Sequence, residues 1–143
     1  MVPVNYLAVV VSAVAMFILG WLWYGVFFQK PWMQAMGWSE AQIAAMRQSG
    51  GKGMSVNYGI QALGALVMAF VLSHALIFAS AYLGVTGISA GLQAAFWNWL
   101  GFIAPVTVGS VLWDGKSWKL WFINAGYYLA GLVVMGLILA LWV

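Results

Sequence analysis

The sequence from Val56 to Tyr82 reads VNYGIQALGALVMAFVLSHALIFASAY and contains no aspartate, glutamate, lysine or arginine. A helix that crosses a lipid bilayer needs about 20 predominantly apolar residues, and this run is longer than that. Three further runs of the same kind indicate an all-α membrane protein of four transmembrane helices, with residues 1–143 forming a single transmembrane domain. The predicted spans cover residues 4–28, 56–82, 89–113 and 117–143.

The overall composition agrees with this and excludes several kinds of function. The chain is 66% hydrophobic and 5% charged, whereas soluble domains are roughly a quarter charged. Because there is no cysteine, disulfides and thiolate metal sites are excluded. A single histidine and two acidic residues leave few groups for catalysis or metal binding, so we expect no enzyme and no cofactor. The basic residues form no cluster of the nucleic-acid-binding kind.

The charged residues define an orientation. None lies in the N-terminal tail, the second loop or the C-terminal end, so both charged loops share one face of the membrane. The five lysines and arginines all lie on that face, and the positive-inside rule makes it cytoplasmic. Both termini are therefore expected on the non-cytoplasmic side. The charged residues are Lys30, Glu40, Arg47, Lys52, Asp114, Lys116 and Lys119.

The loops differ greatly in length. The cytoplasmic loop of residues 29–55 contains Ser39 followed by Gln42, a capping-box pattern that predicts a short helix over 40–48. Gly50 and Gly51 are expected to end this helix, which is suited to lie on the headgroups as an interfacial helix. The second loop is a short turn bounded by Gly84 and Gly87. The helices on either side of it must be antiparallel neighbours.

The second and fourth spans share the frame N-x-G-x-x-x-x-G-x-x-V-M, which starts at Asn57 and again at Asn124. The ends of the first and third spans also agree, with LWYG at 22–25 and LWDG at 112–115. Chance similarity between apolar helices is one explanation. We favour duplication of a helical hairpin, which gives two related antiparallel hairpins in a parallel repeat.

Polar side chains within the spans are the candidate functional residues. On helical spacing, Asn57 and Gln61 share a stripe with Gly64, and Asn124 and Tyr128 form the equivalent stripe of the fourth span. The two stripes would face each other across a twofold axis. In the third span, Pro105 is expected to kink the helix near Gly101. The candidates for a polar pathway or for packing are Asn57, Gln61, His74, Asn98, Asn124 and Tyr128.

Two interpretations of these residues remain open. They hold helices together through hydrogen bonds and close approach, or they line a solute path or ligand cavity. His74 is the one ionisable side chain well inside the bilayer, and it is either functional or hydrogen-bonded to a neighbour such as Asn98. A seam of small residues on the second span is expected to serve packing in either case. It consists of Ala62, Ala69, Ser73 and Ser80.

Several motifs are shared with a known family. Asn5-Tyr6-Leu7, the GWLWYG run at 20–25, and Gly37-Trp38-Ser39-Glu40 stand together with Phe122 to Tyr127. As a set they resemble the small bacterial membrane family catalogued as domain of unknown function 1761. The resemblance covers essentially the whole chain. It implies a four-helix protein of the bacterial inner membrane, with no established activity, cofactor or catalytic residue to transfer.

No buried carboxylate or lysine appears in any span, which argues against proton-coupled transport and against a charged substrate bound at mid-membrane. We therefore expect a passive pathway or binding site for small uncharged or lipid-like molecules. Because glycine and alanine faces exceed what one bundle needs, we also expect a homo-oligomer, most simply a dimer, surrounded by membrane lipid. The alternative is a structural or accessory subunit that docks on a larger membrane complex.

The orientation gives a first prediction. A phosphatase that is active only outside the cytoplasm, fused after the last residue, is expected to be active in cells because the C-terminal end carries no basic residue. The same phosphatase inserted at Ser49 in the first loop should be inactive. The reverse pattern of activities would show that the orientation is wrong.

Overall fold

The structure is a computed structural model that describes residues 3–49 and 54–142. Within these residues, four helical segments are long and apolar enough to cross a membrane, as the sequence predicts. They lie at Tyr6–Phe27, Met54–Leu83, Gly87–Leu112 and Trp118–Leu141. The chain is therefore an all-helical membrane protein in the part that the structure describes.

Two of the four spans are single helices and two are interrupted. The second span is α4 (Met54–Leu83) and the fourth is α8 (Trp118–Leu141). The first consists of α1 (Tyr6–Leu22) and the π-helical turn η1 (Trp23–Phe27). The third consists of α5 (Gly87–Asn98), the π-helical turn η2 (Trp99–Ile103), α6 (Ala104–Thr107) and α7 (Gly109–Leu112). The first loop holds α2 (Gln29–Met36) and α3 (Glu40–Gln48).

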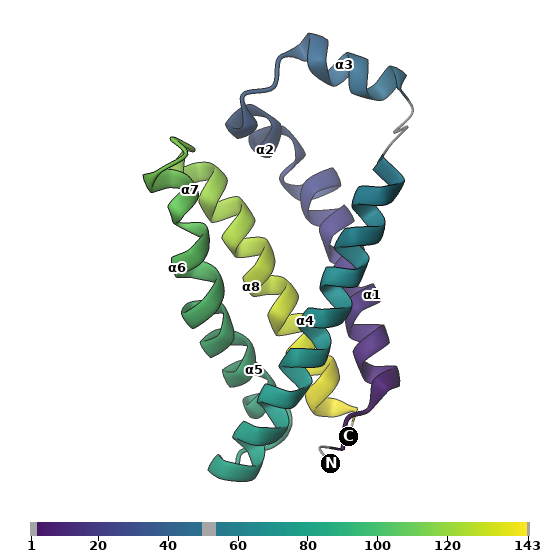
Figure 1. Ribbon diagram of the computed structural model, residues 1–143, viewed down its shortest axis with the longest axis vertical. Helices are drawn as coiled ribbons and strands as arrows, with labels where there is room; N and C mark the ends of the chain where they lie inside the picture. Colours follow the sequence, from purple (N-terminus) through teal and green to yellow (C-terminus); the bar gives the residue numbers. More distant parts are fainter. Residues whose placement is uncertain (1–2, 50–53, 143) are drawn as a thin grey trace.

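Both charged loops lie at one end of the molecule. Figure 1 shows α3 and the α7–α8 connection at this end, while both termini and the α4–α5 turn lie at the other. Lys30, Asp114, Lys116 and Lys119 are exposed, as their charge requires. Gly50, Gly51 and Lys52 lie outside the described residues. We call the two ends the charged end and the terminal end.

Local sequence explains the two helices of the first loop. The backbone N–H of Ser39 donates to Gln42 Oε1 over 2.8 Å, and the N–H of Gln42 donates to Ser39 Oγ over 3.3 Å. This is the predicted capping box. Helix α2 is not among the predicted elements, although its sequence signals are present. Pro31 lies in the first turn, and Gly37 ends the helix with a φ of 74°, a left-handed conformation that suits glycine.

Pro105 disturbs the third span at the point where a kink is expected. Its ring has no N–H to donate to the carbonyl of Gly101 and collides with that carbonyl in a regular helix. The chain responds with η2, in which the N–H of Ala104 donates to Trp99 five residues earlier. The span continues beyond this turn as α6 and α7.

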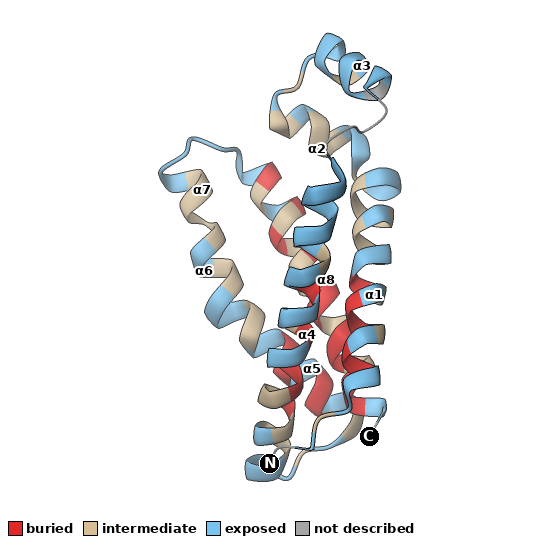
Figure 2. Ribbon diagram, turned by 45° about the vertical axis from the view of Figure 1, so that its right-hand side comes forward, coloured by how far each residue is buried: buried red, intermediate tan, exposed pale blue. Residues whose placement is uncertain are grey.

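Helix α8 is the centre of the bundle. It contacts α1, α4 and α5, and contributes more buried residues than any other helix of the described chain. Figure 2 shows that buried residues gather toward the terminal end, whereas α3 and the first half of α4 are exposed. The structure is therefore closely packed at the terminal end and more open at the charged end.

The tightest helix contact lies between α5 and α8. A Cβ atom placed on Gly136 would lie 2.5 Å from the carbonyl oxygen of Gly91, and one on Gly91 would lie 2.5 Å from that of Gly136. Ala95 and Ala140 follow one turn later on each helix and border the same contact. Small residues spaced by four allow membrane helices to approach until their backbones touch.

Three hydrogen bonds join α1 and its π turn to α8. Tyr127 donates its hydroxyl to the carbonyl of Met16 over 3.2 Å and fills the space that Gly20 leaves open. Further toward the charged end, the indole N–H of Trp23 donates to the carbonyl of Ile123 over 3.0 Å. The third bond runs from the hydroxyl of Tyr24 to Asn124 and is described below with the candidate residues.

From the other side of α8, η2 makes a matching bond. The indole N–H of Trp99 donates to the carbonyl of Ala125 over 2.8 Å. Trp23 and Trp99 each begin a π-helical turn, so both π turns present an indole to the same turn of α8. The backbone of α8 is thus held between them.

Replacing Gly136 by alanine should destabilise the fold, because the added Cβ has no room without moving two backbones apart. Overpacking of this kind costs about 1–3 kcal/mol. Thermal unfolding in detergent should show a lower midpoint for Gly136→Ala. Gly59→Ala is the matched control, since nothing lies within 4 Å of the added Cβ. Equal midpoints for the two variants would contradict the assigned contact.

Replacing Trp99 by phenylalanine keeps an aromatic ring but removes the donor to α8. We expect a loss of about 1 kcal/mol, the usual size of one such hydrogen bond. Trp97→Phe is the control, because the Trp97 side chain is 62% exposed two residues earlier. Reversible unfolding in detergent can compare the two variants, and a larger loss for Trp97→Phe would refute the assignment.

Candidate functional site

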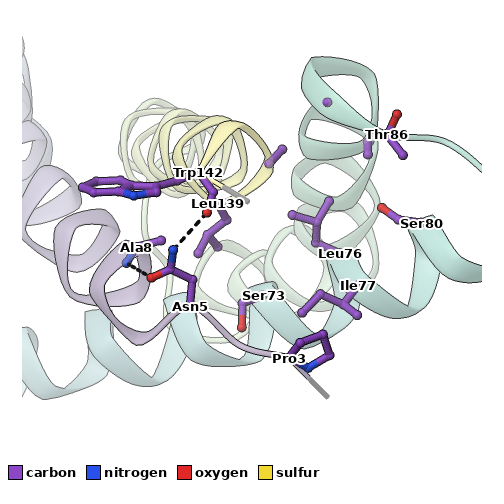
Figure 3. A pocket seen from close by; sticks show the side chains of 13 residues that line it. Pro3, Asn5, Ala8, Ser73, Leu76, Ile77, Ser80, Thr86, Leu139 and Trp142 are labelled. Carbon is purple, nitrogen blue, oxygen red and sulfur yellow. Dashed lines mark hydrogen bonds between the residues drawn. The ribbon is translucent and has the colours of Figure 1, made fainter. Parts of the chain in front are cut away.

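A pocket of about 270 Å³ lies at the terminal end, where the four spans converge. Figure 3 shows its walls, which come from the start of α1, the last part of α4, the start of α5 and the end of α8. The lining residues are Pro3, Asn5, Ala8, Ser73, Leu76, Ile77, Ser80, Thr86, Gly87, Ala90, Leu139, Ala140 and Trp142.

Asn5 builds the wall where the two chain ends meet. Its side-chain oxygen accepts a hydrogen bond from the N–H of Ala8 over 3.1 Å and so caps α1. Its side-chain amide donates to the carbonyl of Trp142 over 3.1 Å, as Figure 3 shows. One residue therefore starts α1 and ties it to the end of α8.

The opposite walls combine small, aliphatic and hydroxyl side chains. Ala90 lies next to Gly91, and Ala140 lies one turn beyond Gly136, so the close contact of α5 with α8 sets the position of both. Ser73 is buried and donates its hydroxyl to the carbonyl of Phe70 in its own helix over 2.8 Å. Its hydrogen bond is thus satisfied within α4.

The chemistry of the lining is neutral. Its polar groups are a carboxamide, three hydroxyls and an indole N–H, from Asn5, Ser73, Ser80, Thr86 and Trp142, and none of its side chains is ionisable. Such a lining has no general acid or base and no activated nucleophile. What it offers is an apolar volume with a few hydrogen-bonding groups, which is the usual composition of a ligand pocket.

The predicted candidate residues lie elsewhere, and none of the six lines this pocket. Asn57 and Gln61 are exposed on α4 near the charged end, whereas Asn124 is half-buried on α8. The hydroxyl of Tyr24 donates to Asn124 Oδ1 over 3.0 Å. Tyr128 is half-buried beside Tyr127, with ring centroids 5.2 Å apart. The structure therefore does not bring the two amide stripes together within the chain.

His74 and Asn98 do not form the hydrogen bond with each other that the sequence suggested; each side chain has a partner in its own helix. His74 Nδ1 lies 2.9 Å from the carbonyl oxygen of Phe70, and its ring lies between those of Phe70 and Phe78. Asn98 donates its side-chain amide to the carbonyl of Ala94 over 2.8 Å. Both polar groups are thus engaged by their own helices. Among the described residues, no three histidine or acidic side chains gather as a metal site would require.

Part of the pocket was visible in the sequence. Ser73 and Ser80 belong to the small-residue seam, and a spacing of seven places them on one face of α4. The sequence predicts that this seam serves packing, and Ser73 is indeed buried, but both residues also border the pocket. Asn5 enters the sequence analysis only through the family motif. Its capping pattern was the available signal, because an asparagine before an apolar helical run predicts an N-cap.

Comparison with known proteins gives one positive result. No curated protein and no solved structure matches the chain. One family model matches residues 7–140, which is nearly the whole chain and includes most of the pocket. The chain therefore belongs to the family of proteins of unknown function named DUF1761, the family that its motifs resemble.

Proposed function

We propose that this protein binds a small uncharged or lipid-like molecule in the pocket at its terminal end. The observation that carries the proposal is that all four spans contribute to one pocket with no charged side chain in its lining. Its volume of about 270 Å³ is just below the range of about 300–1,000 Å³ that is typical of ligand pockets. A ligand of this class needs no catalytic group, and we propose binding without catalysis.

The polar groups of the lining suggest the form of the ligand. Leu76, Ile77 and Leu139 provide apolar surface, whereas Ser80 and Thr86 carry hydroxyls for which the described residues offer no hydrogen-bond partner. A molecule with an aliphatic body and a hydroxyl or ester group would satisfy both kinds of surface. Because buried charge without a partner is costly, a charged group is disfavoured in this lining.

We infer that the pocket opens toward the non-cytoplasmic face of the bacterial inner membrane. The segments that carry Lys30, Lys116 and Lys119 lie at the end of the molecule opposite the termini (Figure 1), and the positive-inside rule assigns that end to the cytoplasm. In this orientation α3 lies on the cytoplasmic headgroups, and a ligand enters from the outer leaflet or from outside.

We further infer that the pocket lies between two halves of a duplicated hairpin. In addition to the frame shared by α4 and α8, the first and third spans share the pattern W-x-W-x-G where their π turns begin, at residues 21–25 and 97–101. We prefer this alignment of the two spans to that of LWYG with LWDG, because it also aligns the two π turns. Both patterns run in the same direction through the membrane, which supports a parallel repeat. The pocket is lined from both halves, as expected of a site at a repeat interface.

The proposal is tested by filling the pocket from one side. Ser80→Phe adds a ring at a lining position, whereas Ala81→Phe adds the same ring at the next, exposed position outside the lining. The probe is monoolein, an uncharged lipid with a free glycerol group. Native mass spectrometry from mild detergent should show one retained monoolein for the natural sequence and for Ala81→Phe. Retention should fall at least tenfold for Ser80→Phe.

The same two variants also distinguish a loss of monoolein binding from a loss of folding stability. Thermal unfolding of Ser80→Phe should stay close to that of Ala81→Phe, because the added ring enters open volume. Equal retention of monoolein by the natural sequence and both variants would show that the pocket does not hold the lipid. Phosphatidylglycerol, which is charged, should be retained less than monoolein, and the opposite order would exclude the neutral ligand class.

A further inference from the structure

One face of α4 at the charged end is unoccupied by the rest of the chain. Asn57, Gln61 and Gly64 are spaced by four and three residues, so they lie on one side of the helix, and we call them the amide face. All three are exposed, and a Cβ atom on Gly64 would meet nothing within 4 Å. No hydrogen bond from another described residue reaches either amide, so the face has no partner in the described chain.

On α8, the asparagine and both glycines of the same sequence frame have partners. Asn124 accepts the hydroxyl of Tyr24, and a Cβ atom on Gly126 would lie 3.4 Å from the Trp23 ring. A Cβ atom on Gly131 would lie 3.0 Å from the end of Met16. In this protein the frame therefore serves to pack a helix closely against another one.

The amides of the amide face lie within a membrane span. Gln61 follows the first residue of the Met54–Leu83 span by seven residues, or about 10 Å at the helical rise. Asn124 follows the first residue of the Trp118–Leu141 span by six residues, so the two amides lie at similar distances from the starts of their spans. A carboxamide at this depth gains from an interhelical hydrogen bond that lipid cannot supply.

We propose that the amide face is the interface of a homodimer, in which it packs on the same face of a second copy about a twofold axis along the membrane normal. A twofold interface requires a surface that is complementary to itself. A carboxamide has both donors and an acceptor, so Gln61 can pair with its own equivalent. Gly64 lets the two α4 backbones approach closely, and the face carries no charge that would repel its copy.

The dimer interface and the ligand pocket are separate. The pocket uses the last part of α4, from Ser73 onward, whereas the amide face uses its first three turns. The pairing of two amide faces therefore leaves the mouth of the pocket open. Loss of the dimer and loss of the ligand can be measured independently in the same preparation.

The decisive variant is Gly64→Leu, compared with Gly131→Leu at the equivalent position of the frame. In the single chain, the new side chain at residue 64 meets open space, so the thermal midpoint should not fall, but close approach of two α4 helices is blocked. Gly131→Leu places a side chain on Met16 and should lower the midpoint. Single-molecule photobleaching of labelled protein in phosphatidylethanolamine–phosphatidylglycerol vesicles measures dimerisation, and Gly64→Leu should weaken it at least tenfold.

Cysteine cross-linking locates the interface directly, because the chain has no cysteine of its own. Gln61→Cys should form a disulfide-linked homodimer in these vesicles on mild oxidation. Val14 lies on α1 and is 52% exposed. The Val14→Cys variant should therefore remain a monomer on the denaturing gel. A dimer unaffected by Gly64→Leu would overturn the proposal. A monomeric natural sequence, or cross-linking of Gln61→Cys to a different protein in native membranes, would also overturn it.

Discussion

The contact between the backbones of α5 and α8 at Gly91 and Gly136 is the constraint on which the terminal end depends. Within a bilayer, helices gain little from burying apolar surface against each other, because lipid tails are equally apolar. Close packing therefore has to come from shape, and two facing glycines give the closest approach that two helices can make. This contact places Ala90 and Ala140, and so it also sets two walls of the pocket.

At the charged end, hydrogen bonds from aromatic side chains replace backbone contact. The indoles of Trp23 and Trp99 reach carbonyls two residues apart on α8, from the two π turns. Each indole belongs to the first residue of a π turn, so the residue that donates to α8 also marks the point where the register of its own helix changes. Figure 1 shows that the helices lie farther apart at this end than at the terminal end. The two ends of the bundle are thus held together by different means.

Sequence alone predicted what depends on local pattern. Four apolar runs determined the spans, and Ser39 with Gln42 determined the start of α3. The pocket could not be predicted in the same way, since it depends on how the ends of four helices converge and on a bond from Asn5 to a carbonyl 137 residues away. The two π turns could not be predicted from the sequence either. Pro105 indicated a disturbed helix, but the sequence did not indicate that the helix would form a π turn beginning at Trp99 or that Trp99 would donate to α8.

The frame shared by α4 and α8 shows that a sequence motif does not by itself determine whether its residues are exposed or packed against another helix. Asn57 and Asn124 occupy the same place in the same frame, yet one is exposed and the other accepts a hydrogen bond from Tyr24. The difference lies in the neighbours: α8 has helices on several sides, whereas the first half of α4 diverges from η2 and α6 (Figure 1). If the two halves descend from one hairpin, they inherited the same packing surface, and only one of the copies is used within the chain. The copy left on the outside keeps its amides and glycine, which are the features that a second protein helix can recognise and that lipid cannot.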